Sequence, residues 1–338
     1  MTRITRARDL TLASLERTLD AIPRRGLRRL AHATPSPDCM RAHRAVELGA
    51  AFLRRRQRQD GALRDFALEP GLSDAWMTAH VALVLEGVPK ARQVQSRAAG
   101  YLFMQGCAKG AWGFNGRVRE DADSTAQALI VLAGSGYAVP RAWRDTLLGF
   151  QHPNGGFSTY RCPTTGPVNG WQAPHADVTL AAHAALRDLD LDAATRAQAF
   201  LERLVANDGL ATAYWWATPA YCLWAQVKFG FGGRQAGSKA AEELAGAPSG
   251  PLDVAMLGWA AASELTSSAT ADAVSYLLAT QLVDGSWPCS PCLRVTDPAL
   301  HSSRLKAPGR VYSGGRRVFS TAHAVAAVAK LHACPPVS

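Results

Sequence analysis

One recurring pattern constrains the fold of this chain more than any other feature. Each copy has a turn built on Gly, usually led by Gln, and a second segment of alanine, leucine and valine at helical spacing. The turns occur at residues 57–63, 105–112, 151–157, 207–210 and 281–287. The clearest second segments begin with Thr at positions 78, 125, 179 and 321. A repeat with a period of about 50 residues indicates stacked copies of one helical unit.

Two weaker units bring the number of helical hairpins to six. Residues 214–229 are rich in aromatic side chains and contain Pro219, which a helix accepts only in its first turn. Residues 253–262 form the other. The second helices are apolar nearly all the way round, so we expect them to be buried inside a ring of more polar first helices. The predicted fold is an all-α (α/α)6 toroid, or barrel. Few residues alternate with period two, so no sheet is expected.

The repeats also predict the domain organisation. Among the 338 residues, they occupy positions 40–332 and leave no room for a second helical domain. Residues 1–39 are expected to form a basic helical extension, and residues 333–338 a tail. Arginines surround leucines within residues 3–30. This pattern fits either a surface helix packed on the domain or a peripheral contact with a membrane.

The turn itself has a physical interpretation. Its Gly permits left-handed backbone, and the Gln amide can bond a neighbouring helix end and lie against the aromatic ring, tying adjacent hairpins together. Residues 281–287 match Gln-x-x-x-Gly-x-Trp completely, whereas the copies at 57 and 151 carry Leu63 and Phe157 in the aromatic position.

Charge and cysteine content narrow the possible partners. The formal net charge is +10, but the basic residues form no stripe interleaved with aromatic rings, so nucleic acid is not an expected partner. No secretory signal or membrane-spanning segment is apparent, and the scattered cysteines suggest reduced thiols in the cytoplasm. Cys289 and Cys292 form a lone Cys-x-x-Cys without further ligands at readable spacing. We therefore expect neither a metal nor a cofactor.

The best clue to chemistry is the segment Asp121-Ala-Asp123-Ser124-Thr125. Asp123 lies two residues before the Thr that opens its repeat, and the equivalent positions in the other units hold acidic or aromatic residues. These are Trp76, Asp177, Trp216, Asp253 and Phe319. All of them begin inner helices, so we expect them near one mouth of the toroid.

Carboxyl and aromatic groups together suit the chemistry of carbocations. A carboxyl group can protonate an alkene only if it stays neutral, and burial beside a second carboxylate raises its pKa. Asp121 and Asp123 are close enough to couple, and Asp177 can approach across the ring. Trp and Phe faces stabilise cations. The competing interpretation is that Asp121 or Asp123 caps a helix, although only one of them can be the cap.

Other candidate binding residues lie outside this motif. His175 occupies the position equivalent to Asp121, where it could relay a proton or merely cap or pack. Tyr214 and Trp259 could line a cavity wall or belong to the core. The insertion at 288–317, which contains Arg316 and Arg317, could be a lid whose guanidinium groups bind a diphosphate or carboxylate, or a solvated loop.

These motifs resemble a known superfamily. The Gln-x-x-x-Gly-x-Trp turns over residues 40–332 look like those of squalene–hopene and oxidosqualene cyclases and of the wider prenyltransferase and squalene-cyclase repeat proteins. Residues 121–126 resemble the Asp-x-Asp-Asp-Thr-Ala motif of hopene and class II diterpene cyclases, with Ser124 replacing an Asp. The resemblance implies metal-independent cyclisation of an apolar isoprenoid, with Asp123 as the initiating acid. Those enzymes usually hold substrate between two helical domains, whereas this chain has one.

Two other function classes remain open at this point. α/α toroids also host hydrolases and lyases, in which paired carboxylates act as acid and base. Such an enzyme requires a cavity rich in polar side chains. The second alternative is a toroid that only binds a lipid or a protein partner. In such a protein the carboxylates serve only as helix caps, and no free carboxyl group faces the cavity.

Overall fold

The computed structural model describes residues 37–163, 166–208, 213–246, 248–301 and 309–333. The chain divides into two units, residues 1–40 and 41–338, and the fold is that of the second unit. Nearly all of the proposed basic extension, residues 1–39, and all but one residue of the proposed tail, 333–338, lie outside the described residues. Both therefore remain predictions.

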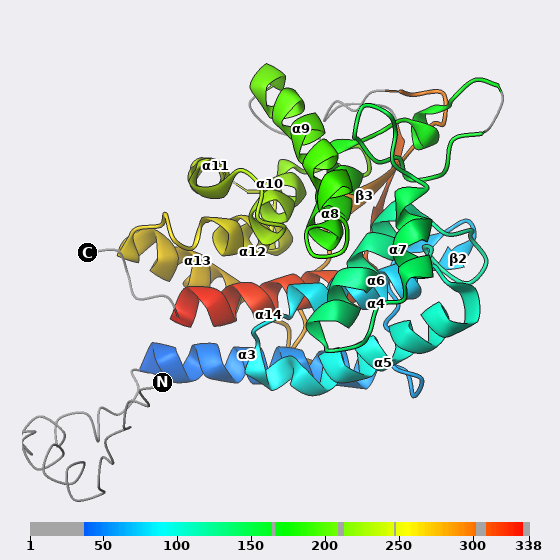
Figure 1. The fold of residues 1–338 in the computed structure, drawn as a ribbon. Coiled ribbons are helices and arrows are strands. Elements are labelled where there is room, and N and C mark those ends of the chain that lie inside the picture. The colour runs from blue at the N-terminus through cyan, green and yellow to red at the C-terminus, as the bar shows by residue number, and fades with distance from the viewer. Residues whose placement is uncertain (1–36, 164–165, 209–212, 247, 302–308, 334–338) are drawn as a thin grey trace, which may run out of the picture. The chain divides into compact units, whose positions relative to one another are not determined.

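Six inner helices form a closed ring (Figure 1). Each helix packs against the next, and the last packs against the first. In chain order these are α4 (Ala75–Val84), α6 (Ala122–Gly134), α8 (Ala176–Leu186), α10 (Pro219–Lys228), α12 (Pro251–Ala261) and α14 (Val318–Ala333). Pro219 is the first residue of α10, as its missing N–H requires.

One outer helix precedes each inner helix in the chain. They are α3 (Pro37–Arg56), α5 (Arg92–Lys109), α7 (Arg141–Leu148), α9 (Leu191–Asp208), α11 (Gly233–Ala245) and α13 (Ser267–Thr280), with short 3-10 turns at Pro89–Ala91 and Gly170–Gln172. The predicted α/α toroid is confirmed. Within the described ranges, no helix combines the length and apolar character needed to cross a membrane.

Burial follows the composition of the two rings. Every residue of α4 is buried, and so is α14 from Val318 to Val328. The outer helices α5, α7 and α13 bury only a few apolar positions each. Alanine-rich inner helices can approach closely because their side chains are small. The predicted order of rings, apolar inside and polar outside, is therefore confirmed.

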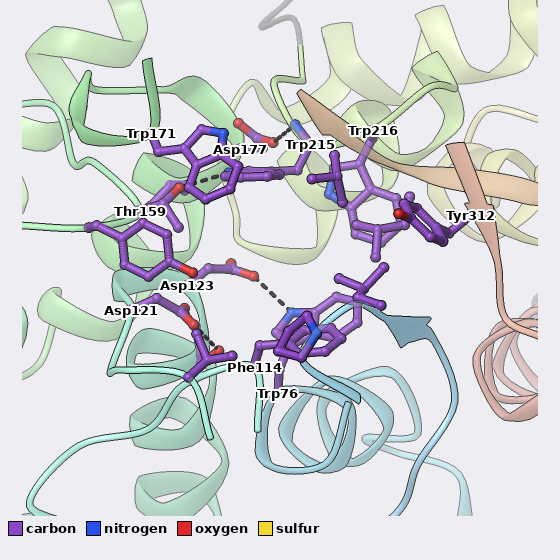
Figure 2. Close-up of a pocket in the computed structure, with 18 of the residues that line it drawn as sticks. Trp76, Phe114, Asp121, Asp123, Thr159, Trp171, Asp177, Trp215, Trp216 and Tyr312 are labelled. Carbon is purple, nitrogen blue, oxygen red and sulfur yellow. Dashed lines mark hydrogen bonds between the residues drawn. The ribbon is translucent and has the colours of Figure 1, made fainter. Parts of the chain in front are cut away.

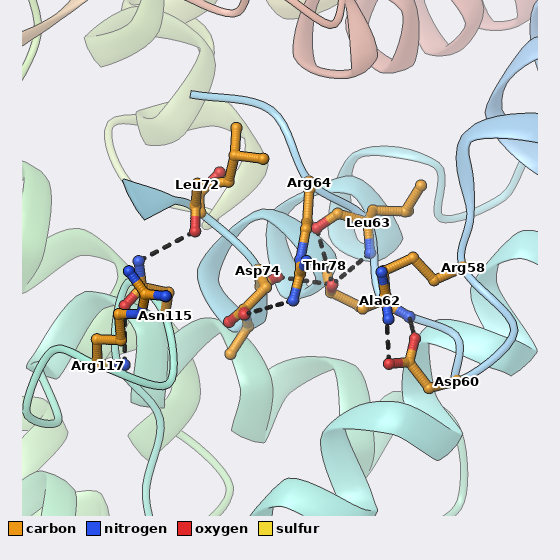
Figure 3. A network of polar contacts seen from close by, with 12 residues as sticks. Arg58, Asp60, Ala62, Leu63, Arg64, Leu72, Asp74, Thr78, Asn115 and Arg117 are labelled. Atoms are coloured by element: carbon orange, nitrogen blue, oxygen red, sulfur yellow. Dashed lines mark hydrogen bonds and ion pairs between the residues drawn. The ribbon is translucent and has the colours of Figure 1, made fainter. Parts of the chain in front are cut away.

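A threonine hydroxyl joins each clear inner helix to the turn before it. The hydroxyl oxygen accepts a hydrogen bond from the backbone N–H at the aromatic position of that turn. The four bonds are Leu63–Thr78 (2.8 Å), Trp112–Thr125 (3.3 Å), Phe157–Thr179 (2.8 Å) and Trp287–Thr321 (3.1 Å). Figure 3 shows the first copy, together with Asp74, which caps α4. The bond fixes the start of each inner helix against its turn.

Glutamine side chains join neighbouring hairpins. In three copies the Nε2 amide donates both to the carbonyl of the turn Gly and to a carbonyl in the next outer helix. The second bonds are Gln57–Val94, Gln151–Ala193 and Gln281–Ala45, each 2.9 Å long. The indoles of Trp112 and Trp287 donate to carbonyls of the preceding outer helix. These amide bonds are the tie between hairpins that the sequence predicted.

Two small antiparallel sheets contradict the prediction that no sheet is present. Strands β1 (Ala67–Leu68) and β2 (Gly71–Leu72) form a tight hairpin. Strands β3 (Pro291–Thr296) and β4 (Gly309–Ser313) form a longer ribbon within the predicted insertion. The ring has no place for this segment, so its backbone groups pair with each other. Strand β3 also bonds residues 215–217.

The turn glycines should be sensitive to substitution. Gly285 has a φ of +87°, and a Cβ there would lie 2.5 Å from the carbonyl oxygen of Leu48 in α3. We expect Gly285→Ala to lower the free energy of unfolding by about 1–3 kcal/mol in urea denaturation. Gly134→Ala is the matched control, because Gly134 is helical and its Cβ would meet no atom within 4 Å. Equal stability of the two variants would contradict this account of the turn.

Candidate active site

One cavity of about 310 Å³ lies at the N-terminal ends of α4, α6 and α8. Its lining is mostly aromatic and aliphatic (Figure 2). The aromatic members are Trp76, Phe114, Tyr160, Trp171, Trp215, Trp216, Tyr221 and Tyr312. The polar members are Glu69, Asp121, Asp123, Ser124, Thr159 and Asp177. The predicted meeting of carboxylates and aromatic rings at one mouth of the toroid is present.

Asp121 is the helix cap of the pair. It is the N-cap of α6, where Oδ1 accepts from the backbone N–H of Ser124 at 2.7 Å and Oδ2 accepts from the Ser124 hydroxyl at 2.8 Å. Burial, together with the charge of Asp123, raises the pKa of Asp121 to about 7, although the Ser124 hydrogen bonds lower it. Both oxygens of Asp121 are thus engaged within the protein.

Asp123 is free of any capping role. It is the second residue of α6, and its Oδ2 accepts from the indole Nε1 of Trp76 at 2.9 Å. The Gln127 amide Nε2 lies 3.0 Å from both carboxylate oxygens. The pKa of Asp123 is raised to about 6. Burial is the largest cause and the charge of Asp177 adds to it, whereas the hydrogen bonds from Gln127 and Trp76 lower the pKa. A partly protonated carboxyl group therefore faces the cavity near neutral pH.

Asp177 reaches the same cavity from α8. Its Oδ2 accepts from the backbone N–H groups of Tyr214 and Trp215, each at 3.0 Å. Its Oδ1 is buried without a hydrogen-bond partner among the described residues. Asp177 therefore anchors the segment before α10 with one oxygen and leaves the other unpaired.

Two of the predicted binding residues form the aromatic wall. Trp76 and Trp216 both line the cavity, with ring centroids 6.1 Å apart. Trp216 stacks on Tyr221 at 3.7 Å, and Trp76 stacks on Phe114 at 6.0 Å. Because the rings support each other, their faces stay fixed beside Asp123.

Segments outside the repeat supply much of the remaining wall. Leu293, Val295 and Tyr312 come from β3 and β4, so the described part of the insertion borders the cavity as predicted. The Trp215 indole donates to the Thr159 hydroxyl at 2.7 Å, and the Trp171 indole donates to the carbonyl of Thr296 at 3.0 Å. Sequence analysis missed these residues. Their only signal was the presence of large aromatic side chains in Gly- and Pro-containing loops.

Three residues that we expected to bind substrate do not line the cavity, namely Phe319, Tyr214 and His175. Phe319 is fully buried behind Trp76 and Trp216, with ring centroids 6.4 and 5.3 Å away. The Tyr214 hydroxyl bonds a backbone carbonyl, and its ring stacks on His175 at 3.6 Å. His175 Nε2 lies 2.6 Å from the carbonyl of Gly170. These three residues support the wall from behind.

Three further residues that we expected to bind substrate also lie outside the cavity lining, namely Trp259, Arg316 and Arg317. Trp259 lies near the C-terminal end of α12, with Lys330 Nζ 3.5 Å from its ring centroid, so it belongs to the opposite end of the ring. The backbone N–H of Arg316 donates to Asp65 at 2.8 Å, and the Arg317 guanidinium pairs with Asp284 at 2.8 Å. These contacts hold the start of α14, and neither arginine lines the cavity.

Comparison with known proteins identifies the fold. No model of a known protein family matches the chain, and neither does any curated protein. A variant of the type II terpene cyclase MstE from Scytonema, in complex with merosterolic acid A, is 21% identical with a TM-score of 0.72, covering 88% of this chain and 98% of that one. Another MstE structure, with geranylgeranyl dihydroxybenzoate as substrate, is 21% identical with a TM-score of 0.70, covering 88% and 99%.

A larger cyclase shares the same toroid. ent-Copalyl diphosphate synthase from Streptomyces platensis is 19% identical with a TM-score of 0.51, and the match covers 77% of this chain and 50% of that one. These likenesses show the fold: the chain has an α/α toroid like that of these cyclases, as its repeats and turns predicted.

The raised pKa values of Asp121 and Asp123 predict how stability depends on pH. The folded protein keeps these protons to about pH 6–7, whereas an unfolded Asp releases its proton near pH 4. Stability should therefore fall as pH rises through that window. Asp123→Asn removes one ionisation, so we expect it to gain up to about 3 kcal/mol relative to the parent between pH 4 and pH 7.

Urea denaturation of both proteins at several pH values measures this difference. Asp272→Asn, at an exposed position of α13, is the control and should show no such trend. A pH-independent difference between Asp123→Asn and the parent would contradict the raised pKa.

Proposed function

We propose that this chain, which has the fold of type II terpene cyclases, cyclises an isoprenoid or a related alkene by protonating it with Asp123. The observation that carries the proposal is the state of this one carboxyl group. It caps no helix, its pKa is raised to about 6, and it faces a cavity whose wall is mostly aromatic.

The first step transfers the Asp123 proton to one carbon of a substrate double bond. The π electrons form the new C–H bond and leave a carbocation on the other carbon. A second double bond attacks that cation, which closes a ring and moves the charge along the chain. The final cation loses a proton to solvent and becomes a neutral alkene, and Asp123, left as a carboxylate, regains a proton from solvent. No oxidant, reductant or metal is needed for this balance.

Hydrogen bonds to Asp123 favour this step. The Trp76 N–H and the Gln127 amide both donate to the carboxylate, so they stabilise the product of proton transfer. Burial acts in the opposite direction and keeps the group protonated until substrate binds. Together, burial and the hydrogen bonds give a carboxyl group that is protonated when substrate binds and that releases its proton readily, as general acid catalysis requires.

The aromatic wall suits the cation that follows. The ring faces of Trp76, Trp216 and Tyr221 offer negative π density without a strong nucleophile. Asp177, which also lines the cavity, adds a second carboxyl group to the wall. We assign Asp177 to stabilising the cation or shaping the cavity, and Asp121 with Ser124 to holding the start of α6.

The cavity also bears on the alternatives. A site for sugars is expected to carry many polar groups, but most of this lining is aromatic or aliphatic. A toroid that only binds is expected to use its carboxylates as caps, but Asp123 is not one. At about 310 Å³ the cavity lies at the low end of the roughly 300–1,000 Å³ range of ligand pockets, which favours a compact isoprenoid chain.

Asp123→Asn tests the proposed role directly. Asn cannot supply the proton, and the cap at Asp121 remains, so we expect a folded protein whose turnover is lower by at least about a hundredfold. The assay incubates purified protein with a panel of prenyl diphosphates, free polyprenes and prenylated phenols and detects cyclised products by mass spectrometry. Asp272→Asn should retain full turnover. Near-normal turnover by Asp123→Asn would move the chemistry to Asp177 or another group.

The pH dependence of turnover gives an independent test. Only protonated Asp123 is active, and its pKa is about 6. We therefore expect kcat/KM to fall about tenfold for each pH unit above 7 and to level off below about pH 5. A rate that rises between pH 6 and pH 8 would indicate a general base in place of a general acid.

A further inference from the structure

A chain of buried polar groups continues from Asp123 into the interior of the ring. The Gln127 Oε1 lies 3.0 Å from Nδ1 of His80, and Nε2 of His80 lies 3.0 Å from Nε2 of His323. All three side chains are at most 1% exposed, and none of them lines the cavity. The proposed function uses the Gln127 bond to Asp123 but does not by itself require either histidine.

The repeat explains how these groups come together. His80, Gln127 and His323 each lie four residues after the second residue of their inner helix, namely Trp76, Asp123 and Phe319. Residues four apart share a helix face, so the three form a second layer directly behind the first. Each comes from a different helix, α4, α6 or α14.

Donor and acceptor roles along this chain are coupled. A charged Asp123 only accepts, so Gln127 must present its NH2 group to it and its carbonyl to His80. His80 then donates from Nδ1, and its Nε2 accepts from the Nε2–H of His323. Turning the Gln127 amide over would require both histidines to exchange their tautomers as well. Coupled networks of this kind resist reorientation of a single member.

The orientation of Gln127 decides where the Asp123 proton can lie. Trp76 and Gln127 both donate to Oδ2, whereas Oδ1 receives only the shared Gln127 bond. A proton on Asp123 is therefore placed on Oδ1. With the amide reversed, the Asp123 hydroxyl would instead donate to the Gln127 carbonyl and would no longer be available to a substrate.

We propose that Gln127, held in one orientation by His80 and His323, is a positioning residue that keeps the Asp123 proton on Oδ1 and available to a substrate in the cavity. This inference rests on the proposed function, because it assigns Gln127 a role in the acid step. It adds two buried histidines as the parts that maintain the orientation.

The neighbouring charges are consistent with neutral histidines. Burial lowers the pKa of His80 to about 3 and that of His323 well below its usual range, and the positive charge of Lys228 acts in the same direction on both. Around Asp123, the titratable groups are Asp121 on its own helix, Asp177 on α8 and Tyr221 on α10. Neither histidine is therefore an alternative source of the proton.

The test combines a titration without substrate and a kinetic assay with substrate. In Gln127→Met the carboxylate loses its amide donor, so the pKa of Asp123 should rise by about one unit. Carbon-13 NMR of the aspartate carboxyl groups measures this shift, with the Asp123 signal assigned by its loss in Asp123→Asn. We expect kcat to fall about 10- to 100-fold and KM to stay unchanged, because Gln127 does not line the cavity.

Two further pairs of variants sharpen the test. His80→Phe removes the partner of the Gln127 carbonyl and should reproduce part of the loss, whereas His80→Asn offers an amide donor near the position of Nδ1 and should restore it. Gln226→Met is the matched control, because Gln226 is a buried glutamine on α10 outside this chain of bonds. Circular dichroism and thermal melting establish that each variant is folded.

Two results would overturn the inference. One is an unchanged Asp123 titration and kcat in Gln127→Met, and the other is an altered KM at constant kcat, which would indicate a substrate contact. If Asp123→Asn remains active, the proposed function fails, but the substrate-free titration still decides whether Gln127 controls the Asp123 carboxyl group.

Discussion

The hydrogen bond from each turn to the threonine of the following inner helix is the constraint on which the site depends. Because Thr125 Oγ1 accepts from the backbone of Trp112, α6 can begin at only one place relative to its turn. The residue two positions before the threonine is then held at the mouth of the ring. The same bond recurs at Thr78 and Thr179, so Trp76 and Asp177 reach the same cavity as Asp123.

The two neighbouring aspartates have different roles: Asp121 caps the helix, and Asp123 is left as the candidate acid. A carboxylate at the start of a helix is usually drawn into capping, since unpaired backbone N–H groups and the helix dipole both favour it. Asp121 caps the helix by accepting hydrogen bonds from Ser124, so Asp123 does not have to act as a cap. Desolvation raises the pKa of both carboxyl groups, but only Asp123 is left without a backbone hydrogen bond and can therefore act on a substrate.

The cavity wall shows where sequence reasoning succeeded and where it failed. Trp76 and Trp216 were predictable because they occupy repeat-equivalent positions. Phe319 also occupies such a position, yet the rings of Trp76 and Trp216 cover it. Arg317 looked like part of an anion-binding lid, but its guanidinium pairs with Asp284. A position in a repeat fixes the height along the ring axis and does not fix which side chain lies in front.

The sequence by itself determined the ring of six hairpins, the ties between them and the height of the candidate acid. Periodicity, Gly turns and the Thr-Ala segments are local features, and each specifies helix ends or helix faces without reference to distant residues. Only the tertiary structure decided that Asp121 caps while Asp123 does not, and that Asp123 bonds Trp76 and Gln127. It also decided that the β3–β4 ribbon closes the wall. Those outcomes depend on side chains from separate elements competing for the same space and the same donors.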